Sequence, residues 1–198
     1  MLILRVERNN FVSKSEHILD VAETLFNQFG YSAVGVDLIR DHARVSKTSM
    51  YRHFGSKNKL IEAVLTRRHQ RFENTLGKTV IAGSSTEEKL NALLDWHFAW
   101  FREADFKGCM FMHAFAEFKY ADRLLADRAQ QHKAWLKALI ACAFDVDEAR
   151  SEACTSLLLT WFEGLIVTAE FGEIDADREL YRSGMHALAA TRFPTYAQ

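Results

Sequence analysis

The sequence predicts an all-α protein with a small N-terminal three-helix head and a larger C-terminal helical body. The chain has 198 residues but only one proline and nine glycines, which leaves few breaks for a β-rich fold with many turns. Apolar residues recur at three- and four-residue steps through most of the chain, and this is the period of amphipathic helices. We expect the head over residues 13–60 and the body over residues 61–192.

Residues 39–60 hold the most informative pattern, because they place two short helices around a tight turn and then begin a third. Ser46 can cap the second helix, since its hydroxyl would accept from a backbone N–H two or three residues further on. Met50 and Phe54, four residues apart, would anchor the inner face of that helix. Polar and basic side chains are then left to project outward: Lys47, Thr48, Ser49 and Arg52.

Basic residues concentrate in the same region. Residues 1–80 contain 13 Lys and Arg against 8 Asp and Glu, although the whole chain carries a net charge of −1. Six basic residues fall inside the helix-turn-helix segment: Arg40, Arg44, Lys47, Arg52, Lys57 and Lys59. Lys57 would also lie in the first turn of the helix after Ser56, where free N–H groups and the helix dipole favour an anion. A solvated face with a chance charge run is the alternative, but this clustering favours a polyanion partner.

This segment resembles the DNA-binding head of the TetR family of transcriptional regulators. The resemblance covers roughly residues 13 to 62 and rests on residues at the family's spacing: Phe26, Phe29, Gly30, Tyr31, Ile39, Ala43, Val45, Ser46, Tyr51, His53, Phe54, Ser56, Lys57 and Leu60. It implies a homodimer that binds a palindromic site in double-stranded DNA, with repression as the favoured mode and release by a small-molecule effector.

The resemblance also implies which residues bind DNA. They are Arg44, Ser46, Lys47, Thr48, Ser49, Tyr51, Arg52, His53 and Lys57. In these implied roles Lys47, Thr48 and Ser49 face base edges, because they lie in the first turn of the second motif helix. Tyr51, His53 and Lys57 are expected to hold phosphates.

Three features depart from the family's pattern. Arg44 occupies the turn position where glycine is commonest, and a side chain at positive φ there would cost on the order of 1 kcal/mol. Val34 and Gly35 replace the usual Thr or Ser cap, so either Gly35 or Asp37 must cap the helix that follows. Residues 1–12 form an unusual extension to which no role is assigned.

The other predicted helices follow from apolar periodicity, caps and glycines. The first opens at Ser13 or Ser15, carries Ile18, Ala22, Leu25, Phe26 and Phe29 on one face, and stops at Gly30. The helix after Ser56 is expected to run to Gly77, and Ser85 with Glu88 forms a capping box for the next. The remaining segments are residues 86–104, 109–118, 120–144, 147–170 and 175–192.

The predicted helix over residues 147–170 carries a wide apolar stripe. Its members are Cys154, Leu157, Leu158, Trp161, Phe162, Leu165 and Ala169, and the last helix adds Leu180, Ala187 and Leu188. Two such helices from each of two subunits would bury these residues as a four-helix bundle, which is the homodimer the resemblance implies. An ordinary intramolecular core remains open, but a two-fold DNA site favours the dimer.

Large aromatic residues are frequent in the middle of the chain, where the family houses an inducer pocket. Aromatic walls with a few polar groups suit a small, largely apolar ligand. The expected ligand-binding residues are Trp96, Trp100, Phe111, Phe115, Trp135 and Trp161, although aromatic side chains also dominate ordinary helical cores. His97 and His113 are expected to be structural, with no metal site and no cofactor.

Cys109 is a candidate redox or electrophile sensor. The Gly108-Cys109 pair resembles a sub-group of the family in which some members sense oxidants through this cysteine. A helix N-terminus, with Lys107 and His113 close in sequence, would stabilise a thiolate. The alternative, a small buried hydrophobe, is the favoured interpretation. Cys142 and Cys154 are expected on the apolar faces of long helices, where they would react far more slowly.

Other function classes find less support in the sequence. It contains no G-x-S-x-G, G-x-x-x-x-G-K-[ST], G-x-G-x-x-G or H-E-x-x-H pattern, so we do not expect an enzyme. A helical interaction adaptor that does not bind DNA is possible, but it leaves the capped basic helix at Ser46 unexplained. No apolar run approaches the roughly 18 residues that would span a bilayer, so no membrane partner is expected. The protein is expected to be cytoplasmic.

Overall fold

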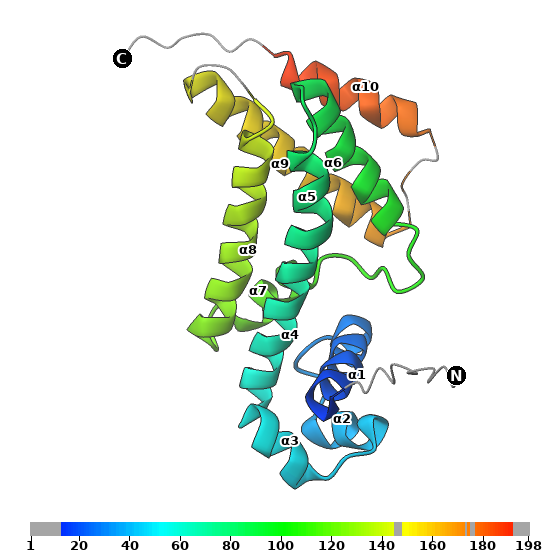
Figure 1. The fold of residues 1–198 in the computed structure, drawn as a ribbon, viewed down its shortest axis with the longest axis vertical. Helices are drawn as coiled ribbons and strands as arrows, with labels where there is room; N and C mark the ends of the chain where they lie inside the picture. The colour runs from blue at the N-terminus through cyan, green and yellow to red at the C-terminus, as the bar shows by residue number, and fades with distance from the viewer. Residues whose placement is uncertain (1–12, 145–147, 173, 175–176, 192–198) are drawn as a thin grey trace, which may run out of the picture. The chain divides into compact units, whose positions relative to one another are not determined.

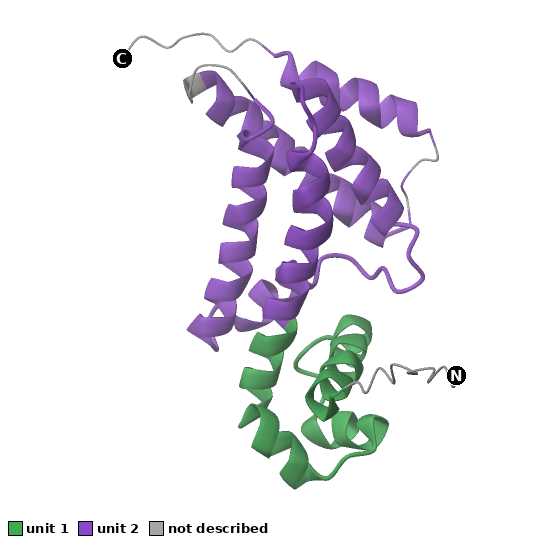
Figure 2. Cartoon of the chain, in the orientation of Figure 1, with its two compact units in different colours: residues 1–64 green, residues 65–198 purple. Residues whose placement is uncertain are grey.

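The computed structural model describes residues 13–144, 148–172, 174 and 177–191. Every regular element in these ranges is a helix (Figure 1), and the all-α prediction is confirmed. The chain divides into two compact units, residues 1–64 and residues 65–198 (Figure 2). The division falls four residues beyond the expected end of the head. Residues 1–12 and 192–198 lie outside the described ranges, and so do the expected ends of two helices at 147 and 175.

The first unit contains α1 (Lys14–Phe29), α2 (Val36–Ala43), α3 (Lys47–Phe54) and the start of α4 (Lys57–Phe72). Ser13 caps α1 by accepting from the Glu16 N–H, and Gly30 ends α1 at a φ of 80°. Its core is made of fully buried side chains: Ile18, Ala22, Phe26, Tyr31, Val34, Ile39, Leu60 and Ile61. Phe29, which the sequence places on the apolar face of the first helix, is instead exposed.

The turn between α2 and α3 adopts the backbone conformation expected of it. Arg44 has φ 52° and ψ 44°, the left-handed region that costs an L-residue roughly 1–2 kcal/mol. At the other end of α2, Gly35 occupies the cap position, where no side chain makes a capping hydrogen bond. Asp37 does not cap α2, because its carboxylate pairs with Arg40 at 2.8 Å and with Lys47 at 3.3 Å.

The helix that begins at Lys57 does not stop at Gly77, contrary to the sequence prediction. It passes through a π-helical segment, η1 (Glu73–Gly77), into α5 (Lys78–Ile81). Gly77 keeps helical dihedrals, φ −57° and ψ −51°. A Cβ at this position would lie 3.3 Å from a ring carbon of Trp135, so the glycine serves a close approach between helices and not a stop. Thr75 and Thr79 each bond the carbonyl four residues earlier, at 2.8 and 2.9 Å, a pattern that often bends helices.

The rest of the second unit contains α6 (Thr86–Trp100), α7 (Met110–Phe118), α8 (Arg123–Ala141), α9 (Glu148–Glu170) and α10 (Arg178–Ala189). Ser85 caps α6 as predicted, accepting from the Glu88 N–H at 3.1 Å. Asp122 caps α8 and Asp177 caps α10. α7 packs along α8, α8 along α9, and α10 against both α9 and α6. The core of the body lies between these faces.

Two buried histidines lie in that core without charge. The side chains of His97 and His132 are 1% and 2% exposed. Burial, the largest cause in each case, lowers the pKa of His97 to about 4 and the pKa of His132 to about 2. An unfolded histidine titrates near pH 6.5. Between that pH and the folded pKa the unfolded chain binds protons that the folded chain does not, so the folded state loses stability as pH falls.

We therefore expect the free energy of unfolding to fall as the pH is lowered from about 6.5 to about 4. His97 alone would contribute roughly 3 kcal/mol to that loss, because one pKa unit corresponds to about 1.4 kcal/mol. Urea unfolding at several pH values, in wild type and in His97→Gln, would measure it. The variant should show a shallower dependence on pH, whereas substitution of the exposed His53 by Gln should not. Parallel curves for all three proteins would contradict the prediction.

Candidate nucleic-acid interface and body cavities

The start of α3 is set by Ser46, as the sequence predicts. Its Oγ accepts the Ser49 N–H at 3.1 Å, and Met50 in the next position is buried in the unit. The side chains left at the surface are Lys47, Thr48, Tyr51, Arg52 and His53, which we call the α3 face. These residues offer ammonium, guanidinium, hydroxyl and imidazole groups, which bond phosphates and base edges.

Ser49 was expected on that surface, and this expectation is wrong. Its side chain is only 8% exposed, and its Oγ has no hydrogen-bond partner among the described residues. Ser49 precedes Met50 by about 100° around the helix, so the burial of Met50 carries Ser49 partly inward. Local sequence could not show this, because the orientation of α3 is set by the helices beneath it.

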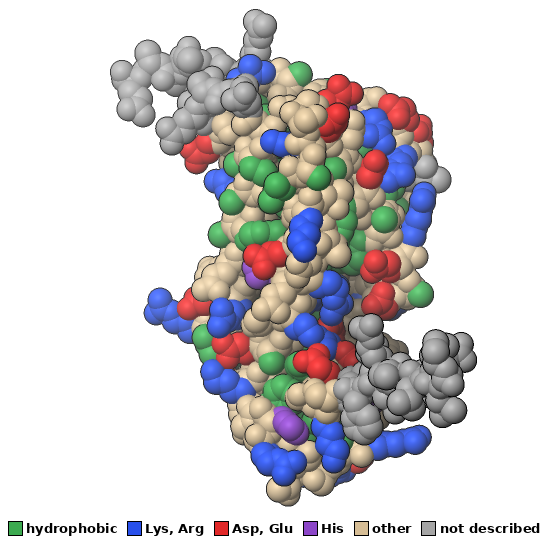
Figure 3. Space-filling view, viewed as in Figure 1, with side chains coloured by type: hydrophobic (Ala, Val, Ile, Leu, Met, Phe, Trp, Pro, Cys, Tyr) green, Lys and Arg blue, Asp and Glu red, His purple; other side chains and the backbone are tan. Residues whose placement is uncertain are grey.

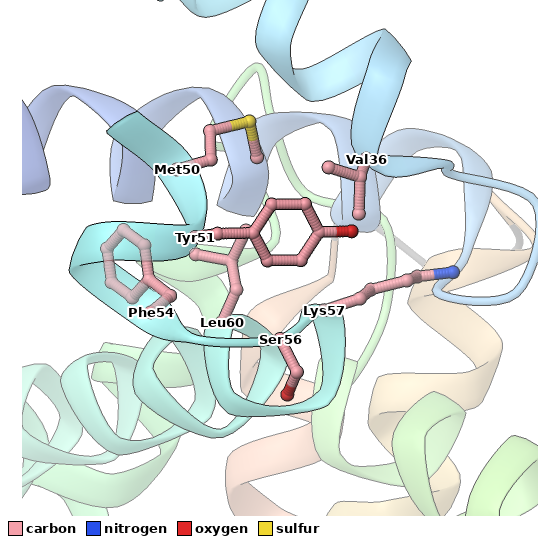
Figure 4. Close-up of a pocket in the computed structure, with 7 residues that line it drawn as sticks. All are labelled: Val36, Met50, Tyr51, Phe54, Ser56, Lys57 and Leu60. Carbon is pink, nitrogen blue, oxygen red and sulfur yellow. The ribbon is translucent and has the colours of Figure 1, made fainter. Parts of the chain in front are cut away.

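Tyr51 and Lys57 lie around a small hollow between α2, α3 and α4 (Figure 4). The hollow has a volume of about 10 Å³, so it holds no ligand. The Tyr51 hydroxyl and the Lys57 ammonium point to the same side of it. Ser56 caps α4 by accepting the Lys59 N–H at 3.1 Å, which places Lys57 in the first helical turn as expected. A phosphate would meet a phenol, an ammonium and free backbone N–H groups there.

Ion pairs reduce the positive charge that the sequence suggests for the helix-turn-helix segment. Lys and Arg side chains gather over the end of the first unit that carries α2 and α3 (Figure 3). Arg40 pairs with Asp41 at 2.7 Å as well as with Asp37, and its hydrogen bond to Asp41 is the main reason that its pKa is raised. Lys59 pairs with Glu62 at 2.9 Å. Within the described residues, Arg44 and Arg52 make no ion pair and remain exposed.

The six expected ligand-binding residues do not surround one pocket. Trp96 and Trp100 line a cavity of about 110 Å³ beside α4 and η1, whose other lining residues are Arg68, Arg71, Phe72, Thr75, Glu103 and Asp105. Phe111 and Phe115 line a cavity of about 230 Å³ between α7 and α8, together with Met112, Ala129, Gln130 and Lys133. Trp135 and Trp161 line neither cavity. Their ring neighbours are His69 and His132 for Trp135, and Phe162 and Tyr181 for Trp161.

Lys133 is a candidate functional side chain that the sequence did not reveal. Its Nζ lies 3.4 Å from the Sγ of Cys109 and pairs with both carboxylate oxygens of Glu163, at 2.5 and 2.7 Å. These neighbours outweigh the effect of burial and raise the pKa of Lys133. Lys133 and Glu163 are thirty residues apart on different helices, so no local pattern could have paired them. Lys133 follows the polar run Gln130-Gln131-His132, so the local sequence does not mark it as a lone charge in an apolar stretch.

The surroundings of Cys109 differ from those expected. Cys109 occupies the N-cap position of α7 without a capping hydrogen bond from its side chain, and it is buried. Lys107 is exposed, and His113 pairs with Glu170 at 3.1 Å. Gly108 has φ +79°, and a Cβ there would meet the Glu170 carboxylate, so only glycine fits before Cys109.

The expectation for Cys142 is wrong, whereas Cys154 is buried as expected. Cys142 is exposed because α8 ends at Ala141, and the cysteine lies in the turn that follows.

Within the described residues, no group of three or more His, Cys, Asp and Glu residues is placed to hold a metal ion. One helical stretch there, Arg150–Glu170, is long and apolar enough to cross a membrane by length and composition alone, although the sequence predicts no such span. Core helices of other proteins share these properties, and 33% of the apolar window is buried here.

Comparisons with known proteins point to one kind of protein. Residues 18–64 match the family model described as bacterial regulatory proteins, tetR family. The transcriptional activator FasR of Mycolicibacterium smegmatis is 33% identical over 104 residues, which are 51% of this chain and 47% of that protein. The transcriptional repressor KstR of Mycobacterium tuberculosis is 28% identical over 81 residues, 41% of this chain and 37% of the relative. The chain thus spans less than half the length of these relatives.

A solved structure shares the fold over most of its length. A TetR-family transcriptional regulator from Streptomyces coelicolor superposes with a TM-score of 0.76 at 22% identity, covering 88% of this chain and 92% of that one. At this level of identity the likeness extends to the fold alone.

Proposed function

The chain belongs to the TetR family of bacterial regulatory proteins, and from that membership we propose a ligand-responsive regulator that binds a palindromic DNA site as a homodimer. The α3 face carries the proposal, because a capped helix presents basic and hydroxyl groups with Lys57 beside it. The named relatives are transcriptional regulators, not enzymes. One is called an activator and the other a repressor, and we propose repression here. A DNA partner also supports residence in the cytoplasm.

In the proposed complex α3 enters the major groove. Lys47 and Thr48, in the first turn of α3, meet base edges, while Arg44 and Arg52 approach the DNA from either end of that face. Tyr51, His53 and Lys57 hold phosphates. Ser46 contributes through its cap, because its Oγ is occupied by the Ser49 N–H. Selection of bound fragments from a random DNA pool would yield the operator on which these roles are tested.

Substituting Lys57 by Ala should weaken binding to all sequences alike, because phosphate contacts do not discriminate between bases. The slope of log affinity against log salt should become shallower by about one unit. Thr48→Ala should instead relax the preference at one base position, and Ser49→Ala, a change inside the unit, is the matched control that should leave operator affinity unchanged. Fluorescence anisotropy with labelled operator at several salt concentrations measures all three. An unchanged salt slope in Lys57→Ala would remove Lys57 from the phosphate contacts.

Exposed apolar side chains on α9 and α10 support the proposed homodimer. Leu157 on α9 is 37% exposed and Leu180 on α10 is 59% exposed, while Cys154, Leu158 and Phe162 fill the protomer's own core. The stripe predicted on α9 is therefore divided between an inner face and an outer face. A Cβ at Gly164 on α9 would meet nothing within 4 Å, so the protomer leaves open space there for a second helix. An interface of α9 and α10 with their copies in a second subunit would cover these side chains.

Substituting Leu157 by Asp should shift the dimer toward monomers. Burying an unpaired carboxylate would cost roughly 3 kcal/mol, which weakens dimerisation by about 100-fold. Sedimentation velocity across a range of concentrations would measure it, with Leu124→Asp on α8 as the control at a similar exposure of 42%. Operator affinity should fall with dimerisation in Leu157→Asp only. Dimers of wild-type stability in that variant would place the interface elsewhere.

A thiol sensor at Cys109 is the second candidate function, and the contact with Lys133 favours it. An ammonium group 3.4 Å from Sγ stabilises a thiolate, which is the reactive form of cysteine. Modification would place a polar or bulky group at the buried start of α7, and repacking of α7 against α8 would follow. The burial of Cys109 supports the opposite interpretation, a packing residue.

The sensor proposal predicts loss of operator binding after treatment with hydrogen peroxide in a Cys142→Ser background, which removes the exposed thiol. Adding Cys109→Ser to that background should abolish the loss, because the reactive sulfur is gone. Operator affinity before and after treatment is the measurement. If both proteins lose binding equally, or neither does, Cys109 is a packing residue.

A further inference from the structure

The cavity between α7 and α8 has the size and walls of a small-molecule site. It measures about 230 Å³ and is lined by Phe111, Met112, Phe115, Ala129, Gln130 and Lys133. An apolar cavity of roughly 150 Å³ already holds one benzene ring. The space between α7 and α8 therefore suits a compound of about two rings. Phe115 is 37% exposed, so one wall borders solvent and gives an entry path.

The charge on the cavity wall is already balanced inside the protein. Lys133 is the charged residue among those that line it, and its three N–H donors face Glu163 and Cys109. A ligand carboxylate would compete with Glu163 for the ammonium and would be repelled by it. A ligand ammonium would have to displace Lys133. The remaining wall is apolar except for the Gln130 amide, so the cavity favours a ligand without charge.

One wall of the cavity is shared with the aromatic core of the body. The Phe111 ring lies flat on the His132 imidazole, with centroids 3.6 Å apart and planes 7° apart. The Nδ1 of His132 is 3.1 Å from the Nδ1 of His69, so one ring donates and the other accepts. His69 lies on α4, the helix whose first turn carries Lys57. A ligand that moves Phe111 must disturb the stack on His132, and with it the hydrogen bond that reaches α4.

We propose that the α7–α8 cavity binds an uncharged, apolar compound of about two rings, and that Phe111, His132 and His69 couple its occupancy to α4. The coupling rests on the proposed DNA-binding function, whereas binding of the compound does not. The two parts are therefore measured separately. A second cavity, beside Trp96 and Trp100, is smaller and is lined by four charged residues. The control measurements must therefore show that the compound binds between α7 and α8 and not in this second cavity.

Binding is tested with two fluorescent probes that share one skeleton. 1-Naphthylamine, a two-ring compound, is neutral near pH 7, and 5-aminonaphthalene-1-sulfonate is the same skeleton with one sulfonate. We expect the neutral probe to bind at least about tenfold more tightly. Phe115→Asp should weaken its binding by at least about tenfold, because it places a carboxylate in the apolar wall. Leu124→Asp, at a similar exposure but outside the cavity, should not. Tighter binding of the sulfonate, or equal binding by both variants, would overturn the assignment.

Coupling is tested by titrating labelled operator with and without the neutral probe. In wild type the probe should weaken operator binding. His69→Leu should bind probe and bare operator like wild type but lose the effect of the probe, because its side chain cannot bond to His132. His69→Gln should recover part of the effect through its amide. A full effect in His69→Leu, or none in wild type, would overturn the coupling. Failure of wild type to bind any operator would overturn the proposed function and leave the probe measurements standing.

Discussion

The hydrogen bond from the Ser49 N–H to the Ser46 hydroxyl fixes the first residue of α3, and the composition of the α3 face depends on it. Each residue of an α-helix turns the next side chain by about 100°. A start one residue later would therefore carry Lys47 out of the helix and rotate the α3 face relative to the cap. The buried Met50 fixes the other side of α3. The cap at Ser46 and the buried Met50 together determine which side chains of α3 lie at the surface. The turn before α3 requires a left-handed backbone at Arg44.

Bonds between residues close in the chain could be predicted from the sequence, whereas placements set by tertiary packing could not. Ser13, Ser46 and Ser85 each accept from a residue three positions on, so a short window contains all the information. Ser49 and Gly77 were misjudged because a neighbouring helix decides their environment: Ser49 is carried inward with Met50, and Gly77 lies against Trp135. The helices of the body were predicted from their periodicity, but the division of their aromatic residues between two cavities depends on how α6, α7 and α8 pack.

The body keeps its buried polar groups by pairing them or by leaving them uncharged. The opposite charges of Lys133 and Glu163 form an ion pair. His97 and His132 instead remain neutral, and the His97 ring is hydrogen-bonded to the Leu93 carbonyl at 2.7 Å. A charged imidazole at the position of His132 would face Lys133 and Arg68, and both of these disfavour the proton. The flat stack of His132 on Phe111 therefore has the character of an apolar contact. That character explains how a polar residue can form part of the core that borders the α7–α8 cavity.

The ion pairs of the first unit affect how α3 would meet DNA. Asp37 holds both Arg40 and Lys47, but these side chains are exposed, and exposed pairs contribute only about 0–1 kcal/mol. Replacing the ion pair between Lys47 and Asp37 by a contact with a phosphate or a base edge would therefore cost little free energy. The Asp37 carboxylate lies beside Lys47 of the α3 face and would repel a misplaced phosphate backbone. Specificity gains from such repulsion, because a shifted register loses the favourable contacts and meets this carboxylate as well.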